Sequence, residues 1–187
     1  GGEVTVVDDL STGRFENTEH LTDHSRFHFA IDTINNAIVM DRLDSECDVI
    51  FHLAAAVGVK LIVRDPVHVI ETNVLGSQAI LQTAARYRKK VLLASTSEIY
   101  GKSTQVPFTE EDDRVLGSTT KARWSYSDSK AVEEFLGLAY HSQMGLPVIV
   151  CRFFNTVGPR QTGQYGMVVP RFVRQALSGE QTKPVLL

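Results

Sequence analysis

Cysteine, clustered basic residues and long apolar runs are scarce or missing in this sequence, and each absence excludes a class of protein. Cys47 and Cys151 are too few for a disulfide framework, so we expect two small buried side chains in a reducing cytoplasm. The formal net charge is -3 without a basic tract, which argues against nucleic acid as the main partner. No apolar run approaches membrane-spanning length and no charged-then-apolar leader opens the chain, so we expect neither membrane insertion nor secretion.

Short apolar, β-branched runs alternate with segments of helical periodicity. The predicted strands span residues 3–10, 26–31, 48–56, 90–96 and 147–154. The predicted helices span residues 67–88, 127–144 and 168–177. Strands that alternate with long helices indicate right-handed βαβ units, and hence an α/β fold with a doubly wound parallel sheet. The 187 residues have room for one domain but not for two full ones.

In such a sheet, functional residues lie at the carboxyl ends of the strands. At the first of these ends, Asp8 can accept both ribose hydroxyls of an adenine nucleotide, which favours NAD over NADP. Asp8 is explained equally well as a helix N-cap or as a solvated acid in a turn. Asp32 can bond an adenine amine, but "IDT" is also a plain N-cap signal.

The fourth predicted strand ends in Ser95, Thr96, Ser97 and Glu98. The Thr96 hydroxyl can donate a hydrogen bond to a substrate oxygen, and the Glu98 carboxyl can move a proton. The alternative is a turn rich in serine and threonine, which is common.

Tyr126 and Lys130 lie four residues apart in "WSYSDSK", ahead of an apolar helical run. On a helix, this spacing places both side chains on one face. A lone pattern of this kind is most often an exposed pair without a function, so its meaning depends on the rest of the chain. No arrangement of histidine, cysteine or carboxylate predicts a metal site or a hydrolase nucleophile.

Taken in order, six stretches resemble the extended short-chain dehydrogenase/reductase family, which comprises NAD-dependent nucleotide-sugar epimerases, dehydratases and decarboxylases. They are "VVDDLSTGR", "VIFHLAAAVGV", "ETNVLGSQAIL", "VLLASTSEIYG", "YSDSK" and "CRFFNTVGPR". They span nearly the whole chain in the order of the family. The resemblance implies a Rossmann-type fold, NAD as cofactor, a nucleotide sugar (first of all a UDP-sugar) as substrate, and a homodimer for the complete protein.

By this resemblance, Tyr126 is the base that takes the proton of the sugar C4 hydroxyl. Lys130 bonds the nicotinamide ribose and lowers the pKa of the phenol, which is about 10 in a free tyrosine. Thr96 aligns the O4 oxygen, and Glu98 is the fourth catalytic candidate. The implied cofactor contacts are Asp8, Asp9, Ser11, Asp32, Thr33, Leu53, Ala54, Ala55, Asn73, Ser95, Tyr126, Lys130 and Phe153. The implied substrate contacts are Thr96, Ser97, Asn155, Val169 and Arg171.

The resemblance leaves the reaction open between three chemistries. Residues 155–177 look most like epimerase members, so a UDP-sugar 4-epimerase is the first prediction. Glu98 is similar to the acid of UDP-glucuronate decarboxylases, which come second. Dehydratases typically carry an Asp-Glu pair where this chain has Ser97-Glu98, so a 4,6-dehydratase is third. A non-catalytic nucleotide-binding domain or an inactive fragment is the alternative from another class.

The glycine-rich turn of the family stands roughly 20 residues before the ribose-binding acid, and here that position falls before residue 1. We therefore expect a partial Rossmann domain over residues 1–187 that starts at the second strand of the fold, with residues 155–187 beginning the substrate-binding part. The first strand is central in the order 3-2-1-4-5-6. Without it, we expect no hydrogen-bonded link between strands 3–8 and 48–53, and no activity from these 187 residues alone.

Overall fold

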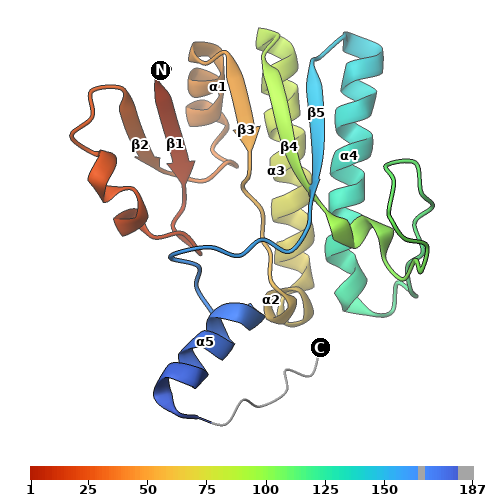
Figure 1. Cartoon of the computed structure of the whole chain (residues 1–187). Helices are drawn as coiled ribbons and strands as arrows, with labels where there is room; N and C mark the ends of the chain where they lie inside the picture. Colours follow the sequence, from red (N-terminus) through yellow and green to blue (C-terminus); the bar gives the residue numbers. More distant parts are fainter. Residues whose placement is uncertain (164–166, 181–187) are drawn as a thin grey trace.

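A computed structural model describes residues 1–163 and 167–180 of the chain (Figure 1). The remaining parts of the predicted segment 155–187 lie outside the described residues. The strands are β1 Val4–Asp8, β2 Phe27–Ile31, β3 Val49–His52, β4 Lys90–Thr96 and β5 Val148–Phe153. All five were predicted, and every pairing between them is parallel. The α/β class is therefore confirmed.

The strands form two separate sheets, β1-β2 and β3-β4-β5. Figure 1 shows the two-stranded sheet beside the three-stranded one, with a gap between β1 and β3. The order corresponds to a doubly wound sheet without its central strand. The predicted interruption is thus confirmed for the described residues.

Two helices cover one face of the larger sheet, α3 Pro66–Tyr87 and α4 Ser125–Met144, and a third, α1 Ala37–Glu46, packs against α3 (Figure 1). α4 ends at Gly145, which adopts the left-handed conformation with φ 69°. Between this layer and the sheet lies a core of side chains from α3, β4 and the turn after α4, namely Leu81, Ala84, Val91, Leu93 and Leu146.

The opposite face of the larger sheet carries large apolar side chains in contact with solvent. Phe51 of β3 is 65% exposed and Ile149 of β5 is 62% exposed. Each strand alternates in this way, with one set of side chains under the helices and the other on the bare face. Among the described residues, helices therefore pack against only one face of this sheet.

Two of the described α-helices were not predicted, and both have weak sequence signals. α1 buries only Met40 and Asp44, so its apolar periodicity is poor. Its N-cap is Asn36, whose side chain accepts from the Val39 N–H, so the alternative interpretation of Asp32 as an N-cap does not hold for α1. α2, Val59–Arg64, is only 6 residues long.

The strand predicted over residues 48–56 ends four residues early, at His52. The reason is that Ala56 finds its hydrogen bonds outside the sheet. The Asn73 side chain accepts from the Ala56 N–H at 2.8 Å and donates to the Ala56 carbonyl at 3.3 Å. The alanine segment therefore leaves the sheet as a loop.

The last helix, α5 Val168–Ser178, projects from the end of the sheet at which the strands terminate (Figure 1). In the described part of the chain, no helix combines the length and the hydropathy that a bilayer crossing requires.

Candidate active site

The predicted catalytic pair lies at the carboxyl end of the larger sheet. Tyr126 and Lys130 occupy the first two turns of α4 and are only 6% and 2% exposed. Tyr126 packs with Ala56, Ile62 and Val69 from three other segments. The interpretation of an exposed surface pair is therefore wrong, because both residues are buried.

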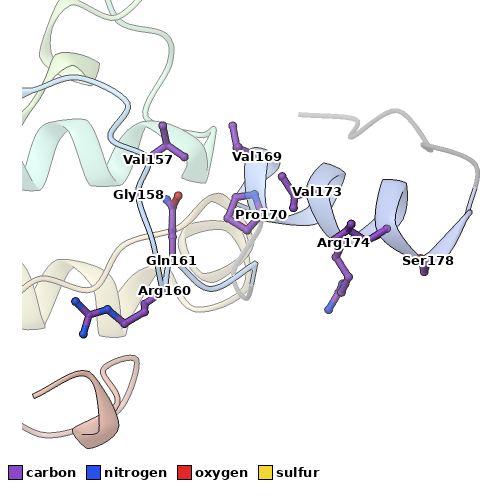
Figure 2. A pocket seen from close by; sticks show the side chains of 10 residues that line it. Val157, Gly158, Arg160, Gln161, Val169, Pro170, Val173, Arg174 and Ser178 are labelled. Atoms are coloured by element: carbon purple, nitrogen blue, oxygen red, sulfur yellow. The ribbon is translucent and has the colours of Figure 1, made fainter. Parts of the chain in front are cut away.

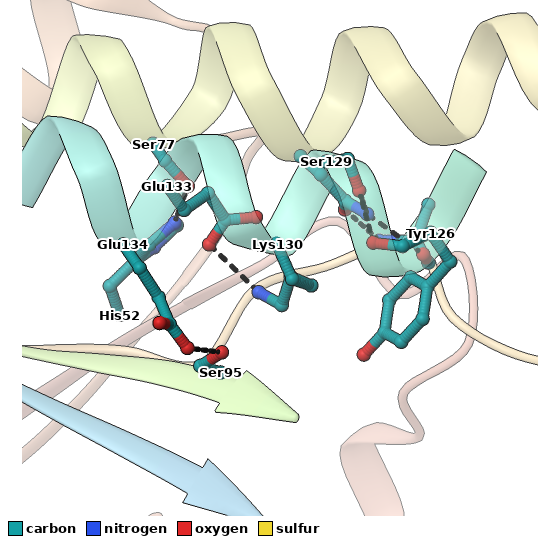
Figure 3. A network of polar contacts seen from close by, with 10 residues as sticks. His52, Ser77, Ser95, Tyr126, Ser129, Lys130, Glu133 and Glu134 are labelled. Atoms are coloured by element: carbon teal, nitrogen blue, oxygen red, sulfur yellow. Dashed lines mark hydrogen bonds and ion pairs between the residues drawn. The ribbon is translucent and has the colours of Figure 1, made fainter. Parts of the chain in front are cut away.

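The electrostatic surroundings of Tyr126 favour the protonated phenol. Burial is the main cause that raises its pKa above the ordinary range, and the carboxylates of Glu98 and Glu133 raise it further. A hydrogen bond with Thr96 acts in the opposite direction. The expected lowering by Lys130 is not seen in this arrangement. The ammonium of Lys130 is paired with Glu133 instead, at 2.8 Å between Nζ and Oε2 (Figure 3).

Around this ion pair lies a buried polar cluster that joins the sheet to the helices (Figure 3). His52 of β3 shares a 2.7 Å hydrogen bond with Ser77 of α3, between Nε2 and Oγ. Burial, assisted by the charge of Lys130, lowers the pKa of His52 to about 4, so this imidazole is neutral at neutral pH.

A second ion pair fixes the neighbouring Glu134. Arg152 of β5 donates to both of its carboxylate oxygens, with Nη2 at 2.8 Å from Oε2 and Nε at 3.0 Å from Oε1. The hydroxyl of Ser95 also donates to Glu134. Ser95 was predicted to contact the cofactor, but the structure directs its hydroxyl to the helix side of the sheet.

Asn73, predicted as a cofactor-side residue, lies fully buried in α3. Besides its two bonds to Ala56, it donates to the hydroxyl of Ser129 at 3.1 Å. Ser129 in turn donates to the carbonyl of Tyr126 at 2.8 Å. Asn73 therefore ties the alanine segment to the first turn of α4, and the polar atoms of its side chain are used in doing so.

The segment after β4 places Thr96 and Glu98 beside Tyr126. Thr96 caps a short 3-10 helix, η3 Ser97–Tyr100, by accepting from the Glu98 N–H at 3.2 Å. Ser127 donates to the Glu98 carbonyl at 2.8 Å, which links this turn to α4. The prediction of a turn is thus correct. This turn also holds the side chains of Thr96 and Glu98 beside Tyr126.

The pKa of Glu98 is raised because the surrounding protein removes water from its carboxyl, and Arg123 partly offsets this effect. A carboxyl of this kind holds its proton at higher pH than a free glutamate. Such a group is suited to donate a proton during a reaction near neutrality.

The predicted adenosine contacts lie apart from this cluster, at the end of the smaller sheet. Their carboxylates bond to the local backbone: Asp8 accepts from the Leu10 N–H at 2.7 Å, and Asp9 from the Ser11 N–H at 2.9 Å. The bond with Ser11 lowers the pKa of Asp9. Asp32 accepts from the Thr33 N–H and the Asn36 side chain, at 2.8 and 2.9 Å.

These carboxylates meet the chemical requirement of a ribose site, since they are acceptors at a strand end. Gly13 also fits such a site, because a side-chain carbon there would lie 2.8 Å from both oxygens of Asp8. Because residue 13 is a glycine, no side chain at that position covers the Asp8 carboxylate. Leu53, predicted beside the cofactor, is 62% exposed, and Ala54 and Ala55 are half-buried after it.

The predicted substrate contacts divide between two places. Asn155, like Phe153 at the end of β5, is exposed. A hollow of about 550 Å³ lies between the loop at 157–161 and α5 (Figure 2), and Val169 lines it. Arg171 does not line this hollow, and its side chain lies against Gly163.

Sequence reasoning missed Glu133, His52, Ser77 and Arg152. The only signal for Glu133 was its position three residues after Lys130 in "KAVEE". Within the part of the chain that the structure describes, no group of three or more histidine, cysteine or acidic side chains could hold a metal ion.

Comparison with known proteins identifies the family. The family model described as GDP-mannose 4,6 dehydratase matches residues 1–186. The chain belongs to this family of NAD-dependent nucleotide-sugar enzymes. The resemblance inferred from the sequence motifs is thereby confirmed.

The family's enzymes that resemble the chain differ in chemistry. It is 46% identical over 181 residues to the UDP-N-acetyl-alpha-D-glucosaminuronate decarboxylase of Bacillus cytotoxicus, an alignment that covers 96% of this chain and 55% of that protein. The dTDP-glucose 4,6-dehydratase of Streptomyces venezuelae, solved with NAD and TYD bound, superposes with a TM-score of 0.85 at 31% identity. That match covers 95% of this chain and 53% of the other.

The UDP-glucose 4-epimerase of Thermotoga maritima, solved with UDP-glucose, also has a TM-score of 0.85, at 30% identity. That match covers 97% of this chain and 57% of the Thermotoga chain. These similarities confirm the Rossmann-type fold. The chain spans about half the length of the curated relatives it matches.

Proposed function

We propose that the complete protein is an NAD-dependent decarboxylase of a UDP-linked hexuronic acid, acting through a 4-keto sugar. The observation that carries this proposal is Glu98, a carboxyl of raised pKa held beside Thr96 and Tyr126. The 46% identity to a decarboxylase supports the same choice over the 4-epimerase that the sequence motifs placed first.

The residues present fit NAD at two points. Asp8 would accept the adenosine ribose hydroxyls at the end of β1, where residue 13 is a glycine. Lys130 would donate to the nicotinamide ribose, since its ammonium has three N–H groups and Glu133 accepts one of them. When bound, NAD⁺ accepts a hydride from sugar C4 and later returns it.

Each catalytic side chain has a distinct task in this reaction. Tyr126 takes the O4 proton as C4 is oxidised, while Thr96 aligns O4. The resulting ketone is β to the carboxylate on C5, so the bond between C5 and C6 breaks and carbon dioxide leaves. Glu98 then donates a proton to C5, and Tyr126 returns its proton to O4 when C4 is reduced.

The substrate test uses the complete protein and three nucleotide sugars. We expect carbon dioxide from UDP-N-acetylglucosaminuronate or UDP-glucuronate, and no conversion of UDP-glucose. Tyr126→Phe is the control for a reaction at this site. Conversion of UDP-glucose to its 4-epimer, with no carbon dioxide from either acid, would overturn the decarboxylase assignment.

A 4-epimerase is the second candidate, because the 30% identical Thermotoga enzyme has that activity and superposes over 97% of the chain. Epimerisation needs no proton transfer at C5. We therefore infer that Glu98→Gln separates the two, since it would block the protonation of C5 that completes the decarboxylated sugar and leave an epimerase active.

We also propose that the complete protein is a homodimer and that α3 and α4 carry the interface. Val67 and Ile70 on α3 are exposed, as are Phe135 and Leu138 on α4. Apolar side chains on neighbouring helices form a face that a second copy could cover. Phe135→Glu would then shift the complete protein to a monomer in sedimentation, and an unchanged mass would contradict the proposal.

A further inference from the structure

Glu133 is a buried carboxylate that no step of the proposed reaction uses. Its side chain is 3% exposed, and that of Lys130 is 2% exposed. Oε2 accepts from the Lys130 ammonium at 2.8 Å, whereas Oε1 has no hydrogen-bond partner among the described residues. A half-satisfied carboxylate in the interior is costly, so its presence next to a catalytic lysine calls for a reason.

The neighbouring polar side chains are bonded to other groups, which leaves Glu133 as the partner of Lys130. On the same helix, Glu134 is held by Arg152 of β5 and by Ser95 of β4. On β3, His52 is neutral and bonds to Ser77.

The other charged group near the phenol is Glu98, beside which lies Arg123. Burial raises the pKa of Glu133 and Glu134 raises it further, while Lys130 and Ser77 lower it. Glu133 and Glu98 both disfavour the phenolate of Tyr126.

We propose that Glu133 is a positioning residue that anchors the Lys130 ammonium and sets the pH range in which Tyr126 works as a base. This inference rests on the proposed role of Tyr126. The bond from Nζ to Glu133 fixes the direction of the ammonium and leaves two N–H groups for other acceptors. The same carboxylate offsets the positive charge that would stabilise a phenolate one helical turn away. Glu133 thus orders Lys130 and restrains the ionisation of Tyr126.

The variant Glu133→Gln separates charge from shape. Its amide oxygen can still accept from Lys130, but the negative charge is gone. In the complete protein, the near-ultraviolet absorbance of the phenolate reports the ionisation of Tyr126, with Tyr126→Phe subtracted to assign it. We expect Tyr126 to ionise on the order of one pH unit lower in Glu133→Gln than in the wild type. The acid limb of kcat/KM should move down by the same amount, a rise of about tenfold at pH values below it.

Two further variants complete the test. Glu134→Gln removes a charge from the next residue, whose partner is Arg152, and should leave the Tyr126 titration in place. Glu133→Met has a similar volume and removes the charge and the acceptor together, so it should show the same downward shift even if Glu133→Gln does not fold. A Tyr126 titration that stays at the wild-type pH, or moves up, in the Glu133 variants would overturn the proposal.

The phenolate titration needs no substrate, so it is independent of the reaction. A downward shift without turnover on any nucleotide sugar would contradict the proposed function and support the role of Glu133. Turnover without a shift of the Tyr126 titration would support the proposed function and contradict the role of Glu133.

Discussion

The two sheets of this molecule differ in how their functional residues are held. In the larger sheet, tertiary contacts from β3, β4, α3 and α4 surround the catalytic candidates, and Lys130 is only 2% exposed. In the smaller sheet, no residue before Met40 is buried, and Asp8 and Asp9 make turn hydrogen bonds to residues two positions on. The catalytic candidates are thus preorganised by packing, whereas the acids predicted to bind adenosine depend on local turns.

This contrast has a physical origin in the sheet topology. β4 has a hydrogen-bonded neighbour on both sides, and the face that carries Val91 and Leu93 lies under α3 and α4. β1 and β2 have only each other. A two-stranded sheet buries little apolar surface and is marginally stable by itself. We expect perturbations of the larger sheet to have the larger effects.

The largest expected effect is catalytic. Tyr126→Phe removes the phenol that we propose takes the O4 proton, so turnover of the complete protein should fall by a factor on the order of 10²–10⁴. Binding of NAD, measured by calorimetry, should change little because the ring is retained. Turnover within a few-fold of the wild type would remove Tyr126 from the mechanism.

A core truncation in the larger sheet should come next. Leu93 is 1% exposed and packs under the helices, so Leu93→Ala should lower the free energy of unfolding by about 2–5 kcal/mol. Chemical denaturation of the complete protein measures this change. Ile31→Ala on β2, where the side chain is 66% exposed, is the matched control and should cost far less. Equal losses from the two variants would break the comparison between the sheets.

The buried histidine predicts a pH dependence of stability. The pKa of His52 is about 4 in the folded protein, against an ordinary value of 6.5. The unfolded state therefore binds the proton more tightly, and stability falls as the pH drops from about 6.5 toward 4. The loss attributable to His52 is on the order of 3 kcal/mol.

His52→Gln should remove this part of the pH dependence, measured as unfolding free energy against pH. His20→Gln changes an exposed histidine near the smaller sheet and should leave the wild-type dependence intact. Identical pH profiles for the wild type and His52→Gln would show that the buried imidazole does not control acid stability.

The smallest expected effect is on the adenosine side. Asp8→Asn keeps the acceptor of the Leu10 N–H but removes the charge that a ribose hydroxyl would meet. We expect the Kd for NAD to rise about tenfold, equivalent to about 1.4 kcal/mol, with kcat little changed. A large drop in kcat would mean that the two regions are coupled more closely than their packing indicates.

Local patterns were enough to predict much of the fold. Alternating apolar runs and helical periodicity located all five strands, α3, α4 and α5, because these signals depend on residues close in sequence. The same patterns missed α1, whose buried face consists of Met40 and Asp44, and α2, which is too short to show a period. It was the resemblance to the family, and not these patterns, that grouped Tyr126, Lys130, Thr96 and Glu98 as catalytic candidates.

By itself, the sequence determined the fold class, the family and the interrupted order of the strands. Only the tertiary structure decided the partners of the buried polar groups. Glu134 pairs with Arg152 because β5 lies beside α4, and His52 meets Ser77 because α3 packs on β3. The physical reason is that burial removes water as a hydrogen-bond partner, so a buried polar group must bond to other protein groups. Charge and hydrogen-bond partners inside a protein are set by whatever the packing brings within reach, and those neighbours come from segments far apart in the chain.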